Sequence, residues 1–208
     1  MTPGAAIAAF SVAAALMTVT PGLDTALVLR TGAVEGPRRA GLAAAGVCLG
    51  TILWGAAVGF GLGALLAASR LAYDLLKWAG AAYLAWLGLN LILRPPSGFE
   101  AAGPSARTRG PGGWLCKGLL NNLLNPKAGV FYVSFLTQFV PPGVPVAGFC
   151  ILLGAIHALM GALWFASLIA ATRPIVQALR RPALMRWLDR ATGGLFLGFG
   201  LRLALDRR

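Results

Sequence analysis

The sequence has little charge for its length. Only 12% of its 208 residues are charged, and 6 acidic residues stand against 18 Lys and Arg. A soluble domain usually carries about 25% charged residues, so this chain cannot cover itself with a polar surface. Hydrophobic residues make up 58% of the chain and the mean hydropathy is +0.75. The composition therefore excludes an ordinary soluble protein and indicates an integral membrane protein.

Histidine and cysteine are also scarce. The chain has one histidine, His157, and three scattered cysteines, Cys48, Cys116 and Cys150, with no CxxC pair. This odd, dispersed set argues against a disulfide framework and against a metal site, so we expect no metal and no other cofactor. No Lys or Arg precedes Arg30, and we therefore expect the first apolar segment to be a retained helix rather than a cleaved signal peptide.

The net charge of +12 raises the question of a nucleic-acid partner. Most basic residues flank apolar segments, where they act as topology signals and contact lipid headgroups. We therefore expect membrane lipids, and no nucleic acid, among the partners.

When the Lys and Arg are assigned to the two sides of the membrane, twelve fall on one side and five on the other. This bias predicts that both termini lie outside.

The long apolar segments predict six transmembrane helices. Two uncharged runs, 40–69 and 128–172, exceed the ~20 residues that span a bilayer. The predicted spans are 5–29, 40–68, 71–93, a fourth from near Trp114 to the prolines at 141–145, 146–171 and 191–201. The sixth is the shortest, and an interfacial helix there remains an alternative. The sequence thus predicts one all-α transmembrane domain over 1–208, with a first repeat at 1–94, a Pro- and Gly-rich loop at 95–113 and a second repeat at 114–208.

Two proline-containing polar motifs interrupt the apolar segments. The first is Thr20-Pro21-Gly22-Leu23-Asp24, and the second is Asn125-Pro126-Lys127, preceded by Asn121 and Asn122. Proline donates no backbone hydrogen bond and displaces the carbonyl four residues earlier, so both motifs are expected to break their helices. With three spans in each half, the second half enters the membrane in the opposite orientation. The two breaks then correspond, which predicts two inverted three-helix repeats with broken first and fourth helices.

Helix length places Lys127 inside the membrane. Only 13 residues separate Lys127 from Pro141, and 13 helical residues rise ~20 Å, short of a ~30 Å hydrocarbon core. A charge at membrane depth costs roughly 2.5 to 3.5 kcal/mol, which favours a functional role for Lys127 and for Asp24. The alternative is a purely structural role: the prolines only kink the helices, Asp24 is solvated near a helix end, and the asparagines only cap the second break.

The chemistry of the two breaks matches a zwitterionic amino acid. Free N–H groups at a helix start attract a carboxylate, and freed carbonyls suit an ammonium group. We therefore assign the substrate carboxylate to Lys127 and the substrate ammonium to Asp24, with asparagines completing the polar lining. The predicted substrate-binding residues are Pro21, Gly22, Asp24, Asn121, Asn122, Asn125, Pro126 and Lys127.

His157 lies near the middle of the fifth span. A mid-membrane imidazole can relay protons, so His157 and Asp24 are the candidates for proton coupling; the sequence leaves open that His157 only hydrogen-bonds a neighbouring helix.

In the second span, Gly46 with Gly50 and Gly55 with Gly59 match the small-xxx-small spacing that lets helices approach closely. The same glycine-rich helix could also pack against a second copy of the chain, so a homodimer is a further possibility.

These motifs resemble those of the lysine exporter family, LysE/RhtB type, of bacterial amino-acid exporters. The likeness rests on residues 20–30, on 76–88 and on 118–139, of which the Asn-Pro-Lys triplet is the most specific. One departure is Leu23, where the family commonly has a second proline. The first break is therefore expected to be milder, which leaves open an altered substrate choice or a weaker member of the family.

The resemblance implies a transporter and not an enzyme. It implies export of amino acids or close derivatives across the bacterial cytoplasmic (inner) membrane, driven by a proton or sodium gradient. The chain has no P-loop for ATP. Two alternatives remain at this point: a membrane thiol-redox carrier of similar six-helix plan, which would need paired cysteines, and a non-transporting membrane assembly protein.

Overall fold

The regular elements are all helical in the part of the chain that the structure describes. The computed structural model describes residues 1–68 and 111–170 continuously, with single residues between 78 and 93 and between 183 and 205. The elements are α1 (Pro3–Val19), α2 (Leu23–Glu35), α3 (Pro37–Ala68), α5 (Pro111–Leu123), α6 (Pro126–Val130), the π-helix η1 (Phe131–Phe135), the 3-10 helix η2 (Leu136–Phe139) and α7 (Val146–Ala170). Much of the spans predicted at 71–93 and 191–201, and most of the predicted loop, lie outside the described residues. An all-helical fold is confirmed there, and the six-span repeat remains a prediction.

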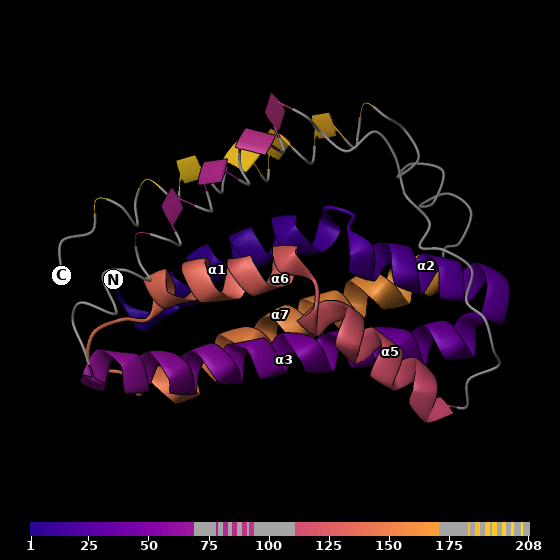
Figure 1. The fold of residues 1–208 in the computed structure, drawn as a ribbon, viewed down its shortest axis with the longest axis horizontal. Coiled ribbons are helices and arrows are strands. Elements are labelled where there is room, and N and C mark those ends of the chain that lie inside the picture. The colour runs from indigo at the N-terminus through magenta and orange to yellow at the C-terminus, as the bar shows by residue number, and fades with distance from the viewer. Residues whose placement is uncertain are drawn as a thin grey trace.

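Two helices are long and apolar enough to cross a membrane among the described residues. They are α3 and α7, which confirms helices at the predicted second and fifth spans. The pair α1 and α2 makes a third candidate if it is counted as one span with a bend of 48°. Figure 1 shows the α1–α2 break and the α5–α6 break both near the middle of the molecule's long axis.

Two predicted boundaries were wrong by a few residues. Helix α2 continues to Glu35 instead of ending at 29, and only Gly36 separates it from α3. Gly36 has φ of +89°, a left-handed backbone that glycine adopts without a Cβ clash. Helix α5 begins at Pro111 rather than near 114, because the first position of a helix needs no N–H donor and so accepts proline.

Glycines on α3 let it pack closely against α5 and α7. A Cβ on Gly46 would lie 2.0 Å from the carbonyl oxygen of Leu115 on α5, and a Cβ on Gly55 would lie 2.8 Å from that of Cys150 on α7. Neither position can carry a side chain without moving a backbone, so the close helix packing predicted from the glycine spacing is confirmed. These glycines face helices of the same chain, and the homodimer stays a prediction.

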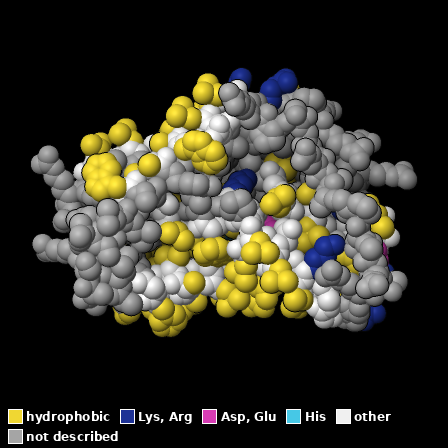
Figure 2. All heavy atoms as spheres, in the orientation of Figure 1, with side chains coloured by type: hydrophobic (Ala, Val, Ile, Leu, Met, Phe, Trp, Pro, Cys, Tyr) yellow, Lys and Arg dark blue, Asp and Glu magenta, His cyan; other side chains and the backbone are white. Residues whose placement is uncertain are grey.

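The core is aromatic where α1 meets the second broken segment. Phe10 of α1 and Phe131, Phe135 and Phe139 of η1 and η2 are all 0% exposed, and their rings pack against one another. This cluster holds η1 and η2 against α1 and α7. On the face that Figure 2 shows, hydrophobic side chains cover much of the described surface, as expected for helices that face lipid.

Candidate functional site

The first break lies between α1 and α2. Helix α1 ends at Val19, and Thr20 donates to the Leu16 carbonyl through both its N–H (3.0 Å) and its Oγ1 (2.6 Å). Pro21 supplies no N–H, and α2 begins at Leu23 with Gly22 as its N-cap. Asp24 then sits in the first turn of α2, where a negative charge is stabilised by the helix dipole. The predicted break is confirmed, and it brings Asp24 to a helix N-terminus.

The second break lies between α5 and α6. Asn125 caps α6, because its Oδ1 accepts a hydrogen bond from the Lys127 N–H at 3.0 Å. Pro126, at the first position of α6, leaves the Asn122 carbonyl without its usual helical donor. That carbonyl instead accepts from the Asn125 N–H at 3.1 Å and from Trp54 Nε1 of α3 at 3.4 Å. The Asn122 carbonyl therefore has replacement donors, and Asn125 does act as a cap.

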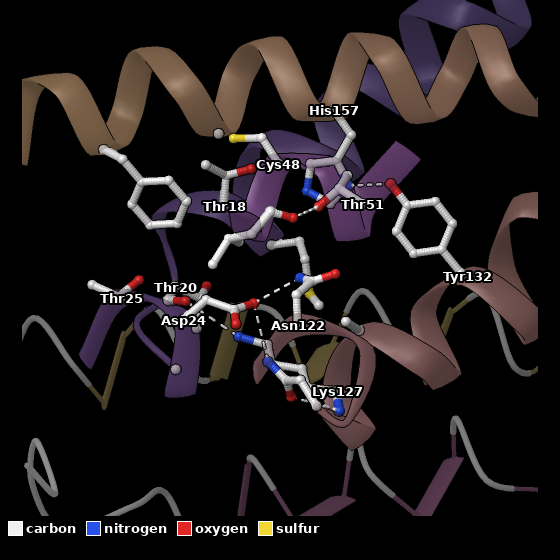
Figure 3. A pocket seen from close by; sticks show the side chains of 17 residues that line it. Thr18, Thr20, Asp24, Thr25, Cys48, Thr51, Asn122, Lys127, Tyr132 and His157 are labelled. Atoms are coloured by element: carbon white, nitrogen blue, oxygen red, sulfur yellow. Dashed lines mark hydrogen bonds between the residues drawn. The ribbon is translucent and has the colours of Figure 1, made fainter. Parts of the chain in front are cut away.

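The two breaks meet through Asp24. Its Oδ1 accepts from Asn121 Nδ2 at 2.7 Å, and its Oδ2 accepts from Asn122 Nδ2 at 2.9 Å and from Asn125 Nδ2 at 3.2 Å. Figure 3 shows Asp24 facing Asn122 across the pocket. Such donors stabilise an ionised carboxylate inside the protein. An ionised carboxylate can accept about four hydrogen bonds, so three amides leave room for one further donor.

Lys127 reaches across in the opposite direction. Its Nζ donates to the Thr20 carbonyl at 3.2 Å, an oxygen at the first break. Gly22 lies beside the lysine stem, where an added Cβ would be 3.8 Å from Lys127 Cδ. Each break thus contributes one charge, and each charge is bound by polar groups of the other break. The sequence placed these charges in corresponding halves but did not predict this exchange.

The two breaks open onto one cavity of about 60 Å³. This is enough for about four water molecules. Of the predicted residues, Gly22, Asp24, Asn122, Asn125, Lys127 and His157 line it. Asn121 takes part through its bond to Asp24, and Pro21 and Pro126 act by interrupting the helices. The other lining residues, which sequence reasoning missed, are Met17, Thr18, Thr20, Thr25, Val47, Cys48, Thr51, Ala128, Tyr132, Gly161 and Phe165.

His157 belongs to an aromatic stack on the far side of this cavity. Tyr132 Oη lies 2.8 Å from His157 Nδ1, and the two rings are stacked at 5.8 Å. Trp54 of α3 also stacks on Tyr132, with the two ring centroids 6.5 Å apart. The π-helix η1 carries Tyr132, and π-helical turns are frequent at functional sites. His157 therefore does bond a neighbouring segment, and its role in proton coupling stays a prediction.

The three cysteines add no metal-binding group to the described part of the site. Cys48, Cys116 and Cys150 are free thiols. Among the described residues, no three His, Cys, Asp or Glu side chains are grouped so that they could hold a metal ion. The hydroxyls of Thr18 and Thr51 donate to carbonyls four residues earlier. Such bonds are common for threonine in any helix. The sequence therefore gives no signal that these two threonines line a cavity.

Comparison with known proteins identifies the family. Residues 15–207 match the family model of the LysE type translocators. The homoserine/homoserine lactone efflux protein of Salmonella typhi is 30% identical over 96% of both chains. The leucine efflux protein of Enterobacter sp. (strain 638) is 30% identical over 94% of this chain and 93% of its own. The threonine efflux protein of Salmonella typhi is 28% identical over 91% of this chain and 92% of its own.

No solved structure matches the chain. The family match, in contrast, covers nearly its whole length, as do the relatives. The chain therefore belongs to the LysE type translocator family, whose members are membrane transport proteins and not enzymes.

Proposed function

We propose that this protein is a secondary transporter that exports neutral amino acids or close derivatives. One observation carries the proposal: a single cavity receives Asp24 from one broken helix and Lys127 from the other. An amino acid presents the complementary pair of charges at a fixed short separation. Relatives named for the efflux of homoserine, leucine and threonine support the same substrate class.

In this proposal, Asp24 receives the substrate ammonium and Lys127 the substrate carboxylate. Asp24 keeps an open acceptor position beside its three amide donors. The Lys127 ammonium is bound to the Thr20 carbonyl at 3.2 Å. We expect the incoming carboxylate to draw it away, since an ion pair with a carboxylate is stronger than a bond to a neutral carbonyl. The Thr20 carbonyl can also accept a hydrogen bond from the substrate ammonium.

The cavity lining argues for an uncharged substrate side chain. Asp24 and Lys127 are the two charged side chains among the described residues that line it, and they are assigned to the substrate ammonium and carboxylate. A charged substrate side chain would find no further counter-ion among these described residues, which is costly at membrane depth. This favours neutral amino acids over basic or acidic ones.

The wider architecture belongs to the same proposal. We place the protein in the bacterial cytoplasmic membrane as six spans in two inverted repeats, with both termini outside. Two breaks that exchange charges across one cavity are the arrangement that such repeats produce around a central site. Export would be driven by a proton or sodium gradient, with Asp24 and His157 as the residues for proton coupling. A homodimer is compatible with this plan.

The test is efflux by charge-removal variants. Asp24→Ala and Lys127→Ala should each abolish amino-acid counterflow in reconstituted vesicles while the protein still inserts. Lys117→Ala is the matched control, because Lys117 lies one helix earlier and does not line the cavity. Normal counterflow from both site variants would contradict the proposal.

The two alternatives are tested with the same vesicles. A thiol-redox carrier needs cysteines that can pair, whereas Cys48, Cys116 and Cys150 are all free and lie on three different helices. A cysteine-free variant that keeps its efflux would exclude the redox carrier. Substrate flux from purified protein would exclude a non-transporting assembly protein.

A further inference from the structure

One wall of the cavity is formed by a glycine. Gly161 of α7 lines the cavity together with Cys48 of α3 and Phe165 of α7. A Cβ built on Gly161 would lie 3.7 Å from Cys48 Sγ and 3.9 Å from Phe165 Cε2. These are ordinary van der Waals distances, so a methyl group would fit there without displacing either neighbour. The position differs from Gly55 of α3, where a Cβ would lie 2.8 Å from a backbone oxygen.

This wall lies away from the charged end of the cavity. Figure 3 shows Cys48, Thr51 and His157 on one side of the pocket, and Asp24 and Lys127 on the other. An amino acid held by both charges would direct its side chain from Cα toward α3 and α7. The part of that surface around Cys48 and Phe165 is apolar, and Gly161 is the residue there that contributes no side chain.

We propose that Gly161 determines the largest substrate side chain that the transporter accepts. This inference rests on the proposed function, since it concerns the side-chain end of the same site. The cavity is only about 60 Å³, so the space left open by one missing methyl group is a substantial part of it. A residue with a Cβ at 161 would take that space from the substrate and leave the contacts of the charged groups unchanged.

The change Gly161→Ala tests the inference cleanly. Alanine favours the helix over glycine by about 1 kcal/mol and meets no close contact, so we expect the variant to fold and insert. Gly148→Ala is the matched control on the same helix: a Cβ there meets nothing within 4 Å, and Gly148 does not line the cavity.

The measurement is counterflow in vesicles with alanine, threonine and leucine as substrates. One methylene in an apolar pocket changes discrimination by about 10-fold or more. We expect Gly161→Ala to lower the ratio of leucine to alanine transport about tenfold, and Gly148→Ala to leave that ratio unchanged. An unchanged ratio in Gly161→Ala, or an equal loss for all three substrates, would overturn the inference while amino-acid export by the unaltered protein stands.

A binding measurement gives a second, transport-independent readout. A variant with Cys116→Ser and Cys150→Ala leaves Cys48 as the remaining thiol, beside Gly161. Alanine and leucine should each slow the reaction of Cys48 with methyl methanethiosulfonate, and Gly161→Ala should remove the protection by leucine alone. Equal protection by both amino acids in that variant would contradict the inference. No protection by any amino acid, together with no counterflow, would instead refute the proposed function.

Discussion

A carboxylate introduced at Asn122 gives the sharpest test of the contact between the two breaks. Asn122 Nδ2 donates to Asp24 Oδ2 at 2.9 Å, and Asn122 is only 3% exposed. The change Asn122→Asp replaces this donor with an oxygen of the same shape and adds a second negative charge. The two positions are 98 residues apart in the chain, so an interaction between them reports tertiary structure only.

The expected cost follows from the geometry. Two unit charges 2.9 Å apart repel by roughly 6 kcal/mol at an effective dielectric constant of about 20. Proton uptake by one carboxyl limits this cost, and the lost hydrogen bond to a charged group contributes about 1.5 to 3 kcal/mol. We therefore expect Asn122→Asp to lower the free energy of unfolding by about 2 to 4 kcal/mol. For a chain of this length that corresponds to a Tm lower by about 5 to 15 °C.

The assay is thermal unfolding in detergent, followed by tryptophan fluorescence, for a double-mutant cycle. Adding Asp24→Asn to Asn122→Asp exchanges the two groups and restores one amide-to-carboxylate hydrogen bond without two facing charges. The double variant should therefore be more stable than the sum of the single effects predicts, with a coupling of about 1 to 3 kcal/mol. Additive effects of the two changes would refute the contact between the breaks.

Three further predictions concern packing, the aromatic stack and the surface. Gly46→Ala should lower the free energy of unfolding by about 1 to 3 kcal/mol, because the added methyl group overpacks against α5. The control Gly41→Ala, whose Cβ meets nothing within 4 Å, should leave stability unchanged. Equal Tm values for the two variants would contradict the close packing of α3 against α5. Tyr132→Phe leaves the buried His157 Nδ1 without its partner and should cost about 1 to 3 kcal/mol; an unchanged Tm would argue against that hydrogen bond. Glu35→Gln removes the partly exposed ion pair with Arg39 of α3 and should change the free energy of unfolding by less than about 1 kcal/mol. A large Tm shift would contradict the assignment of this pair as a weak surface interaction.

The missed features of the site share one physical cause. The fourth segment was expected to be helical on both sides of its break, and nothing local predicted that residues 131–135 form a π-helix. That turn carries Tyr132 to His157. Cys48 was not among the predicted site residues, and it lines the cavity. In both cases the role depends on which helix lies opposite, and a single sequence does not report that.

The error at the end of the first span has a local cause instead. This span was expected to stop at 29, the residue before Arg30. Helix α2 instead continues to Glu35, where Gly36 with its positive φ ends it. Beyond Gly36, an ion pair between Glu35 and Arg39 joins the end of α2 to the start of α3.

The sequence alone determined the features that depend on local covalent chemistry and on length. Pro21 and Pro126 break their helices because proline has no N–H to donate. The short apolar run after Lys127 predicts a charge at membrane depth, and the composition requires helices that face lipid. Only the tertiary structure decided which polar groups bind those two charged side chains. Asp24 is held by asparagines of the second break and Lys127 by a carbonyl of the first, because segments about 100 residues apart meet only when α3 packs against α5 and α7.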